Sequence, residues 1–227
     1  MHLLDVFRQQ LKGLPFFDGL PDSQLVRLAG AVREERFARD ELIFLKGDPS
    51  TGLFAVLAGT VKLACQSPGG NERVIALPER GQVFGEAALL LDCPYPFNAS
   101  ALTAARLLHV DGQALRDLVA ESTDFAHRML SHLSGGICSI IDDLEDFRMR
   151  APPERIAKFL LDRSGSSGQG DSAIAFPAPK HVFASRLGMT PESLSRAMRD
   201  LAEAGLIKIG KYDVRVVDRM RLAVLAG

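Results

Sequence analysis

Three side chains near the C-terminal end of the sequence have the types and spacing needed to read DNA bases. Glu192, Ser195 and Arg196 stand at positions i, i+3 and i+4, so on a helix they project from a single stripe. Arginine can donate two hydrogen bonds to guanine, glutamate can accept one from the cytosine amino group, and serine can serve either role. We therefore interpret these residues as a reading face that favours a G·C pair.

The surrounding residues predict that this stripe belongs to the second helix of a helix-turn-helix over residues 180–201. Gly188 permits a sharp turn after the first helix, Thr190 suits an N-cap, and Pro191 suits the first helical position. Without such a turn, a glutamate and an arginine four residues apart would indicate only a solvated ion pair. The small and apolar residues that would fix the angle between the two helices are Ala184, Leu187, Leu194 and Met198.

The segment that follows predicts a wing. Gly205 is expected to end the second helix, and two short β-prone runs, LIKI and VRVV, flank a Gly-Lys-Tyr-Asp turn. Basic side chains beside a reading helix meet the DNA phosphates on either side of the groove. In addition to Thr190, the residues that we expect to contact DNA outside the reading stripe are Lys180, Arg199, Lys208, Lys211 and Arg215.

The charge distribution supports this prediction. The 227-residue chain has a net charge of only −1, but from residue 150 onward it has 13 Lys and Arg against 8 Asp and Glu, and before residue 150 it has 14 against 20. A basic C-terminal third can approach the phosphate backbone, whereas an acidic N-terminal part cannot. This asymmetry indicates a sensor joined to a DNA-binding domain, and 47% hydrophobic content is enough to bury the cores of both.

The N-terminal part of the sequence is rich in β-prone runs. Four such runs lie between Arg36 and Val110, separated by turns with glycine, proline or asparagine, and they predict an antiparallel barrel or roll. Ahead of them, Pro21-Asp22-Ser23 followed by QLVRLAGAV predicts a capped helix that covers one end of the roll.

An apolar seam with alternating spacings of four and three residues connects the two halves. It consists of Ala126, Leu130, Leu133, Ile137, Ile140, Leu144 and Phe147. A strict 3.5-residue period favours a two-stranded coiled coil, so we expect a homodimer; packing of the seam on its own roll is the alternative. Gly135 and Gly136 inside it should each cost roughly 1 kcal/mol relative to alanine, unless they permit a close helix crossing or a ligand-driven adjustment.

These parts together predict an α+β chain. We expect an N-terminal antiparallel β-roll sensor domain over residues 1–120, a long dimerisation helix over 121–150 and a C-terminal winged helix-turn-helix over 151–227. Pro152 and Pro153 either end the long helix or begin the next one, and we expect the segment from Arg150 to Pro153 to be the hinge.

The order of the parts resembles the CRP/FNR family of bacterial transcription regulators, whose sensor is a roll of the cyclic-nucleotide-binding type. The resemblance extends from about Phe16 to Arg221 and is carried by FLKGDPSTGLFAVLAGTVKL, VFGEAALLLD and TPESLSRAMRDLAEAGLI. It implies an effector-controlled regulator that binds double-stranded DNA and RNA polymerase, not an enzyme. Glu192, Ser195 and Arg196 resemble the FNR and Dnr branches, which read inverted TTGAT half-sites; the cyclic-AMP receptor type has glycine at the position of Ser195.

The resemblance also bears on the effector. Gly85 and Glu86 match the pair that contacts the ribose in cyclic-nucleotide-binding members, but residues 93–98 hold no arginine or lysine where those members neutralise the phosphate. A buried phosphate without a cation would be costly, so we expect no cyclic AMP. The expected effector pocket consists of Gly85, Glu86, Phe97, His127 and Leu130, and the expected dimer interface of Leu133, Ile137, Ile140, Leu144 and Phe147.

The Dnr branch, which the chain resembles most, responds to nitric oxide through haem, and this implies haem as a cofactor. Haem iron needs an axial ligand, and the available histidines are His2, His109, His127, His132 and His181. The histidines that this branch carries near its first helix are absent. An iron-sulfur cluster is not expected because no cysteine precedes Cys65, and the three cysteines show no metal-binding spacing. A redox thiol at Cys65 or Cys93 is an alternative.

Two other classes of protein fit the sequence less well. A metal-dependent enzyme on a cupin-like roll needs clustered histidines and carboxylates, but the β-prone region contains only His109. A stand-alone ligand-binding module would lack the reading helix and the wing. The sequence has no long apolar run and no basic segment followed by an apolar one at its start, so we expect a cytoplasmic protein without a membrane span.

Overall fold

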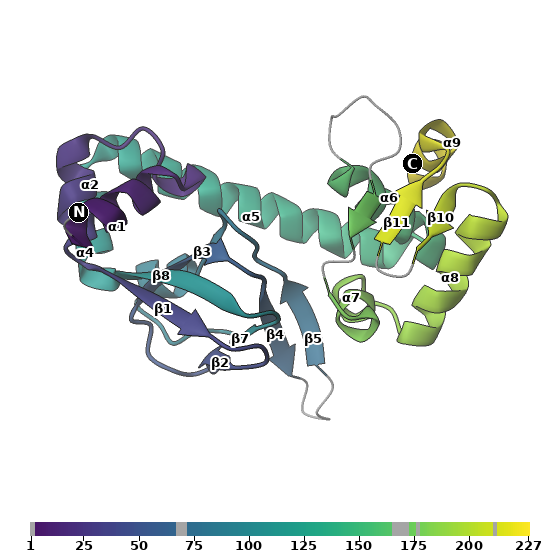
Figure 1. The fold of residues 1–227 in the computed structure, drawn as a ribbon, viewed down its shortest axis with the longest axis horizontal. Coiled ribbons are helices and arrows are strands. Elements are labelled where there is room, and N and C mark those ends of the chain that lie inside the picture. Colours follow the sequence, from purple (N-terminus) through teal and green to yellow (C-terminus); the bar gives the residue numbers. More distant parts are fainter. Residues whose placement is uncertain (1–2, 67–71, 165–172, 176–177, 211–212) are drawn as a thin grey trace. The chain divides into compact units, whose positions relative to one another are not determined.

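The computed structural model describes residues 3–66, 72–164, 173–175, 178–210 and 213–227 (Figure 1). The chain forms two compact units, Met1–Cys138 and Ser139–Gly227, and the boundary between them lies inside the long helix α5, Thr123–Met149. Each unit has its own hydrophobic core and is described separately.

The first unit contains two four-stranded antiparallel sheets, which confirms the predicted roll. The first sheet has the order β1, β8, β3, β6, with strands Val32–Phe37, Ala105–Asp111, Gly52–Ala58 and Val83–Phe84. The second sheet has the order β2, β7, β4, β5, with strands Leu42–Phe44, Asn98–Ala101, Val61–Gln66 and Glu72–Ala76.

Strand β3 of the first sheet is buried on both of its faces. Successive residues of a strand point to opposite sides, so Phe54 and Val56 of β3 pack between the two sheets while Leu53 and Ala55 pack against helices. The helices of this unit are α1 Leu3–Lys12, the 3₁₀ turn η1 Pro15–Phe17, α2 Asp22–Ala29, α3 Glu86–Leu90, α4 Gly112–Glu121 and the start of α5. A β-prone run such as GLFAVLA is therefore apolar on both faces.

The N-terminal helices differ in part from the sequence prediction. Helix α2 is present, but its N-cap is Pro21 and no side chain caps it. The Asp22 carboxylate instead accepts a hydrogen bond of 2.7 Å from Arg8 Nη1 of α1. Helix α1 was not predicted, and it buries Phe7 and Leu11 in the same core as α2.

Helix α5 begins inside the core of the first unit. Phe125 and Met129 are buried there, whereas four members of the apolar seam are more than half exposed in the single chain. The exposed members are Leu130, Ile137, Ile140 and Leu144, with exposed fractions of 61%, 59%, 55% and 53%. The alternative that this seam packs on its own roll is wrong for these residues, because Phe125 and Met129 make that contact; Leu133 alone packs partly against the core.

The second unit contains the predicted winged helix-turn-helix. Its helices are α6 Pro152–Arg163, α7 Lys180–Arg186, α8 Pro191–Glu203 and α9 Arg219–Ala226, and its sheet has the order β10, β11, β9, with strands Ile207–Ile209, Asp213–Val216 and Ala173–Ala175. Pro152 begins α6, and the Ala151 backbone N–H donates to Glu154 Oε2 at 2.9 Å. Among the residues that the structure describes, no helix combines the length and the apolar character needed to cross a membrane.

Candidate nucleic-acid interface

Helix α8 begins and ends with well-defined capping contacts. At its start, the Thr190 side chain accepts a hydrogen bond of 3.2 Å from the Ser193 backbone N–H, with Pro191 in the first helical turn. At its end, Gly205 has a φ of +69°, and the Leu206 N–H donates to the Leu201 carbonyl at 3.0 Å. These contacts set the length of the helix and hold it against the rest of the unit.

The turn that precedes α8 fixes its angle to α7. Gly188 has a φ of +65°, a left-handed conformation that favours glycine, and the Met189 N–H donates to the Ala184 carbonyl at 3.0 Å. The apolar side of α8 is buried in the core of the unit through Leu194, Ala197, Met198 and Leu201. The predicted helix-turn-helix is therefore present.

The opposite side of α8 is exposed. Glu192, Ser195, Arg196 and Arg199 all lie on it, so the structure brings the four predicted side chains to one face of one helix. In the described part of the chain, neither Arg196 nor Arg199 forms an ion pair. Both guanidinium groups are available to an incoming ligand.

Two neighbouring contacts define the hydrogen-bonding chemistry of this face. The Ser195 hydroxyl donates to the Pro191 carbonyl at 2.8 Å, which leaves the serine lone pairs to accept. Hydrogen bonds from its own backbone N–H and from Thr190 lower the pKa of Glu192, so the carboxylate stays ionised and accepts only. The face therefore presents acceptors at Ser195 and Glu192 and a donor fork at Arg196, the set that a G·C pair requires in the major groove.

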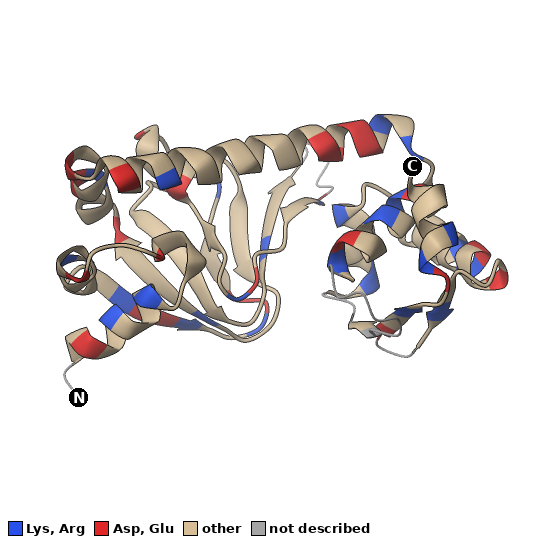
Figure 2. Ribbon diagram, turned by 90° about the horizontal axis from the view of Figure 1, so that it is seen from above, with Lys and Arg blue, Asp and Glu red and all other residues tan. Residues whose placement is uncertain are grey.

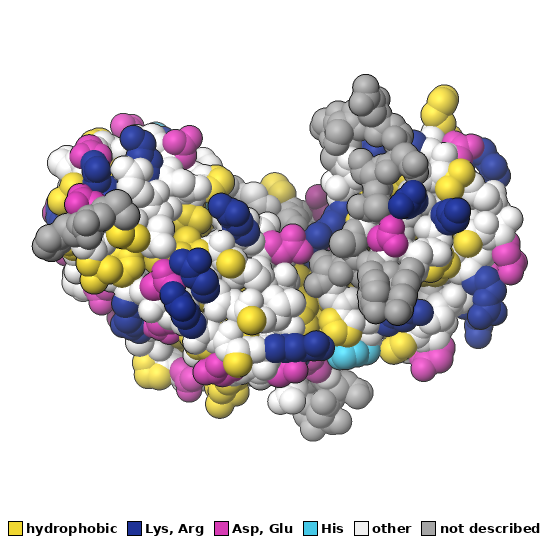
Figure 3. Space-filling view, in the orientation of Figure 1, with side chains coloured by type: hydrophobic (Ala, Val, Ile, Leu, Met, Phe, Trp, Pro, Cys, Tyr) yellow, Lys and Arg dark blue, Asp and Glu magenta, His cyan; other side chains and the backbone are white. Residues whose placement is uncertain are grey.

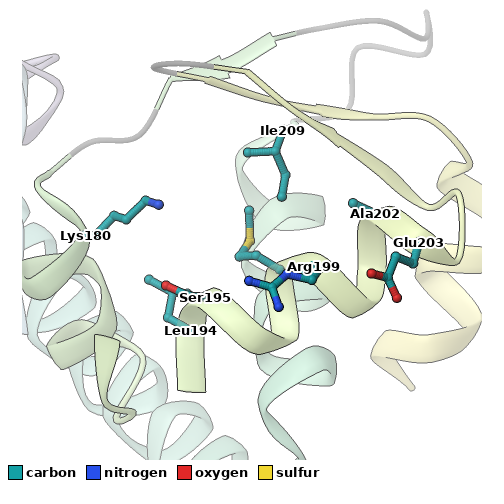
Figure 4. A pocket seen from close by; sticks show the side chains of 8 residues that line it. Lys180, Leu194, Ser195, Arg199, Ala202, Glu203 and Ile209 are labelled. Carbon is teal, nitrogen blue, oxygen red and sulfur yellow. The ribbon is translucent and has the colours of Figure 1, made fainter. Parts of the chain in front are cut away.

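A groove of about 460 Å³ runs between α8 and strand β10 (Figure 4). Its apolar residues include Leu194, Met198 and Ala202 of α8, and Ile209 of the wing, which is 44% exposed. Lys180 and Arg199 also line the groove. Ser195 and the Glu203 carboxylate complete the lining, so the groove combines an apolar floor with two cations, which suit a phosphate, and one anion, which does not.

The wing strands carry additional positive charge. Lys208 is exposed on β10 and lies opposite Arg215 of β11, whose Nε is 3.6 Å from Asp213 Oδ2. The predicted contact residue Lys211 lies outside the described residues. Figure 2 shows Lys and Arg spread along several elements of the second unit, and Figure 3 shows them on the face of this unit that is in view.

The expected effector pocket is only partly brought together. Gly85 precedes α3 with a φ of +93°, and a Cβ there would lie 3.2 Å from the Gly52 carbonyl oxygen. Phe97 is half-buried and packs near Phe44, with ring centroids 6.0 Å apart. His127 and Leu130 of α5 are exposed to solvent in the single chain. Of the three expected pocket residues that lie outside α5, Glu86 is the one with a described side-chain contact to that helix.

Glu86 contacts a histidine that the sequence did not place in the expected pocket. His132 Nε2 of α5 lies 3.3 Å from Glu86 Oε1, and the His132 ring packs edge-on against Phe16 with centroids 5.1 Å apart. Glu86 Oε2 is buried without a hydrogen-bond partner in the ranges that the structure describes. The spacing of His132 from the buried Phe125 and Met129, seven and three residues, could have placed it on the inner side of α5.

Aromatic residues fill the segment that lacks the phosphate-binding cation. Tyr95 is 2% exposed and stacks on Phe44 with ring centroids 3.7 Å apart, and its hydroxyl donates to the Gly52 carbonyl at 3.2 Å. The Thr51 backbone N–H donates back to the same hydroxyl at 3.3 Å. This part of the roll is built around aromatic packing, without a charged side chain aimed inward from residues 93–98.

The remaining candidate ligands for haem iron or a metal ion are the other histidines and the three cysteines. His109 is 1% exposed, its Nε2 lies 3.0 Å from Thr51 Oγ1, and burial lowers its pKa. His181 is exposed, and His2 lies outside the described residues. Cys65, Cys93 and Cys138 are free thiols. No cluster of three or more His, Cys, Asp or Glu suited to a metal ion occurs among the residues that the structure describes.

Comparisons with known proteins agree with this architecture. A family model for the cyclic nucleotide-binding domain matches residues 34–122, and one for the Crp-like helix-turn-helix domain matches residues 154–225. The CRP-like cAMP-activated global transcriptional regulator of Mycobacterium tuberculosis is 26% identical over 210 residues, which cover 91% of this chain and 94% of that protein. The transcriptional activator protein FnrA of Stutzerimonas stutzeri is 25% identical over 192 residues, which cover 83% and 78%.

Solved structures show the same arrangement of elements. DNR from Pseudomonas aeruginosa superposes with a TM-score of 0.52 at 26% identity and covers 99% of this chain and 100% of that one. FixK2 from Bradyrhizobium japonicum, at 23% identity, shares the fold with a TM-score of 0.78 over 86% of this chain and 98% of its own. A cyclic nucleotide-binding domain, a long helix and a Crp-like helix-turn-helix thus follow one another in a chain whose relatives are regulators rather than enzymes, and the chain belongs to the CRP/FNR family of DNA-binding transcription regulators.

Proposed function

We propose that this regulator binds, as a homodimer, an inverted repeat of TTGAT-like half-sites, with Glu192, Ser195 and Arg196 reading the bases. The observation that carries the proposal is their joint exposure on one face of a capped helix whose other face is buried. Arg196 would donate to guanine, while Glu192 and Ser195 would accept from base amino groups. The acceptor state of Ser195 follows from its hydrogen bond to Pro191.

The phosphate contacts in this proposal come from residues around the reading face. Lys180 and Arg199 beside the groove and Lys208 on the wing are exposed cations, and the Thr190 backbone lies at the positive N-terminal end of α8. Lys211 is assigned to the same set from the sequence alone. These contacts would position the helix without selecting a sequence.

The dimer in this proposal is formed by helix α5. The exposed seam residues form a continuous apolar stripe along the helix, and a monomer rarely leaves such a stripe in water. Leu133 within the stripe and Phe147 at its C-terminal end are half-buried and belong to the same seam. Pairing of two α5 helices would cover it and present two reading helices to half-sites about 34 Å apart.

In this proposal, each of the three predicted parts of the chain has a separate role. Residues 1–120 sense the effector, 121–150 form the dimer, and 151–227 bind DNA in the bacterial cytoplasm, where RNA polymerase is the further partner.

The effector would enter near Gly85, Glu86 and Phe97. Because residues 93–98 supply aromatic rings and no cation, a ligand without a buried phosphate fits better than cyclic AMP. A cyclic nucleotide or redox control of Cys65 or Cys93 are the rival effector mechanisms.

A second candidate is nitric oxide sensing through haem, as in the Dnr branch. The similarity to DNR over 99% of the chain favours it. The described histidines fit the iron poorly, since His109 is bonded to Thr51 and His132 lies against Glu86, so only exposed rings such as His127 are free. A visible spectrum of the protein titrated with haem, before and after nitric oxide, tests this candidate, with His127→Ala as the variant.

A binding titration tests the proposed function. Fluorescence anisotropy with a TTGAT inverted repeat, the same duplex with scrambled half-sites and a single half-site should give the highest affinity for the repeat. Equal affinity for repeat and scrambled DNA would refute the base-reading assignment. Absence of binding to any duplex would favour a ligand-binding module without DNA function. Higher affinity for the repeat only in the presence of cyclic AMP would support the rival effector.

A further inference from the structure

We propose that the groove between α8 and strand β10 binds a small amphipathic carboxylate, a single carboxylate group on an unbranched apolar chain, and that this ligand competes with DNA. The competition rests on the DNA-binding role proposed for α8, whereas binding of the ligand to the groove does not. The open apolar floor of the groove and the distribution of charge along it carry the assignment.

The wing leaves part of the apolar side of the DNA-binding unit uncovered. Ile207 and Ile209 stand two positions apart on β10, so their side chains point to the same side of the strand. Ile207 is 3% exposed, whereas Ile209 is 44% exposed although it points toward α8 (Figure 4). Met198 and Ala202 of α8 line the same groove. The core of the unit thus continues into a groove whose apolar floor is open to solvent.

The size of the groove suits a small organic ligand. Its volume is about 460 Å³, and small-molecule sites commonly enclose roughly 300 to 1,000 Å³. An apolar chain laid along Met198 and Ile209 would remove apolar surface from water on both sides of the contact. The floor therefore favours the hydrocarbon part of a ligand.

The positive charge of the groove lies toward the start of α8. Lys180 and Arg199 are exposed, and neither forms an ion pair in the part of the chain that the structure describes. Figure 4 shows Lys180 near Ser195, Glu203 at the opposite end of the groove and Arg199 between them. The Ser195 hydroxyl donates to the Pro191 carbonyl, so the two cations alone would bind an anionic group.

This arrangement of charge fits one anionic group better than a row of them. A nucleic acid strand carries a negative charge at every phosphate, so a strand that followed the whole groove would place one of them near Glu203. A single carboxylate would instead lie between Lys180 and Arg199, and a guanidinium group matches its planar geometry. The uncharged end of the chain would then lie beside Glu203.

The groove shares residues with the proposed DNA interface. Lys180 and Arg199 are assigned to phosphate contacts, and Ser195 is assigned to base reading; all three line the groove. A ligand seated on these side chains would occupy the position of the DNA. We therefore expect the carboxylate to release the regulator from its binding site.

Methyl NMR of the full chain, labelled at the isoleucine and methionine methyl groups, tests the site. Sodium decanoate, kept below the concentration at which it forms micelles, should shift the signals of Ile209 and Met198 in a saturable manner. Decanol, which lacks the charge, should bind more weakly, and decylamine should bind most weakly because the two cations repel its ammonium group. Equal affinity for decanol would overturn the carboxylate assignment, and shifts confined to the β-roll would overturn the groove as the site.

Variants of the lining residues identify the orientation of the ligand. Lys180→Gln should weaken decanoate binding by about 2- to 5-fold, and Glu203→Gln should strengthen it by a similar factor, since each removes one exposed charge. A gain of affinity in Glu203→Gln would not follow from a general loss of stability. Unchanged affinity in both variants would overturn the placement of the carboxylate.

A charge placed on the apolar wall tests the position of the chain. Ile209→Glu should abolish decanoate binding, because a carboxylate would enter the floor of the groove. Val224→Glu is the matched control, since Val224 is an exposed apolar residue of α9 outside the groove lining, and it should bind decanoate like the unaltered chain. Equal loss of binding in both variants would overturn the assignment to this groove.

Competition anisotropy with the TTGAT repeat separates the inference from the proposed function. Decanoate should displace the duplex, whereas acetate at the same concentration, which lacks the apolar chain, should not. Decanoate bound in the groove without displacement would overturn the competition. No decanoate binding by a protein that prefers the TTGAT repeat would overturn the inference and leave the proposed function standing. Decanoate binding by a protein without that preference would refute base reading and leave the ligand site standing.

Discussion

The Ser195 hydroxyl donates its hydrogen bond to the Pro191 carbonyl at 2.8 Å, one turn earlier on the reading helix. This local contact consumes the only donor of a side chain that the sequence allows either to donate or to accept. With Glu192 held ionised beside it, the reading face carries two acceptors and one guanidinium donor. The base that each residue can recognise follows from that division.

Arg196→Ala should weaken binding to the TTGAT repeat by roughly 1 to 3 kcal/mol and reduce the preference over scrambled DNA, because a bidentate guanine contact is lost. Competition anisotropy with both duplexes measures the change. An Arg196→Ala protein that keeps the full preference would show that another residue reads the guanine. Arg116→Ala, which removes an exposed arginine of α4 in the first unit, serves as the control.

Lys208→Ala should weaken binding to all duplexes by a similar factor, since a phosphate contact carries no sequence information. The slope of the logarithm of affinity against the logarithm of salt concentration should fall in magnitude by about 1. Titrations at several salt concentrations give both quantities. A change in sequence preference with an unaltered slope would contradict the assignment of Lys208 to phosphate.

Ile140→Glu should convert the dimer into a monomer, because a charge would enter the centre of the apolar seam on both chains. Binding to the inverted repeat should then fall by about 100-fold, as two linked contacts become one. Sedimentation velocity and anisotropy measure the two effects. The control is Glu145→Gln, an exposed position of the same helix, and a dimeric Ile140→Glu protein would refute the seam as the interface.

Glu34 should contribute to stability only above acid pH. Hydrogen bonds of 3.0 Å from Arg106, with help from Arg36, lower the pKa of Glu34 to about 2, against 4.5 for an unperturbed glutamate. A lowered folded-state pKa gives a contribution that is complete above pH 4.5 and is lost as the pH falls toward 2.

Because this pair lies at the surface of β1 and β8, solvent screens it, and we expect it to contribute at most about 1 kcal/mol. Glu34→Gln should flatten the pH dependence of the unfolding free energy between pH 4.5 and 2, measured by urea denaturation. Parallel curves for the two proteins across that range would show that the pair makes no net contribution.

Local sequence signals determined the reading helix. Thr190 and Pro191 start α8, Gly188 and Gly205 take the left-handed conformations at its two ends, and each of these preferences acts within a few residues. The β-prone runs and the 3.5-residue seam were predicted for the same reason, since a period of hydrophobic residues is visible in one dimension. The exposure of the seam then followed from Phe125 and Met129 making the contact with the roll.

Only the tertiary structure decided which distant groups meet. Glu86 meets His132 46 residues away, Asp143 meets Arg186 43 residues away, and Arg155 meets Leu187 32 residues away. No spacing rule links these pairs. Helix α1, too short to be stable alone, forms because Phe7 and Leu11 find a core to enter. The sequence determined the elements through short-range backbone preferences, whereas packing of the folded chain selected which distant side chains meet.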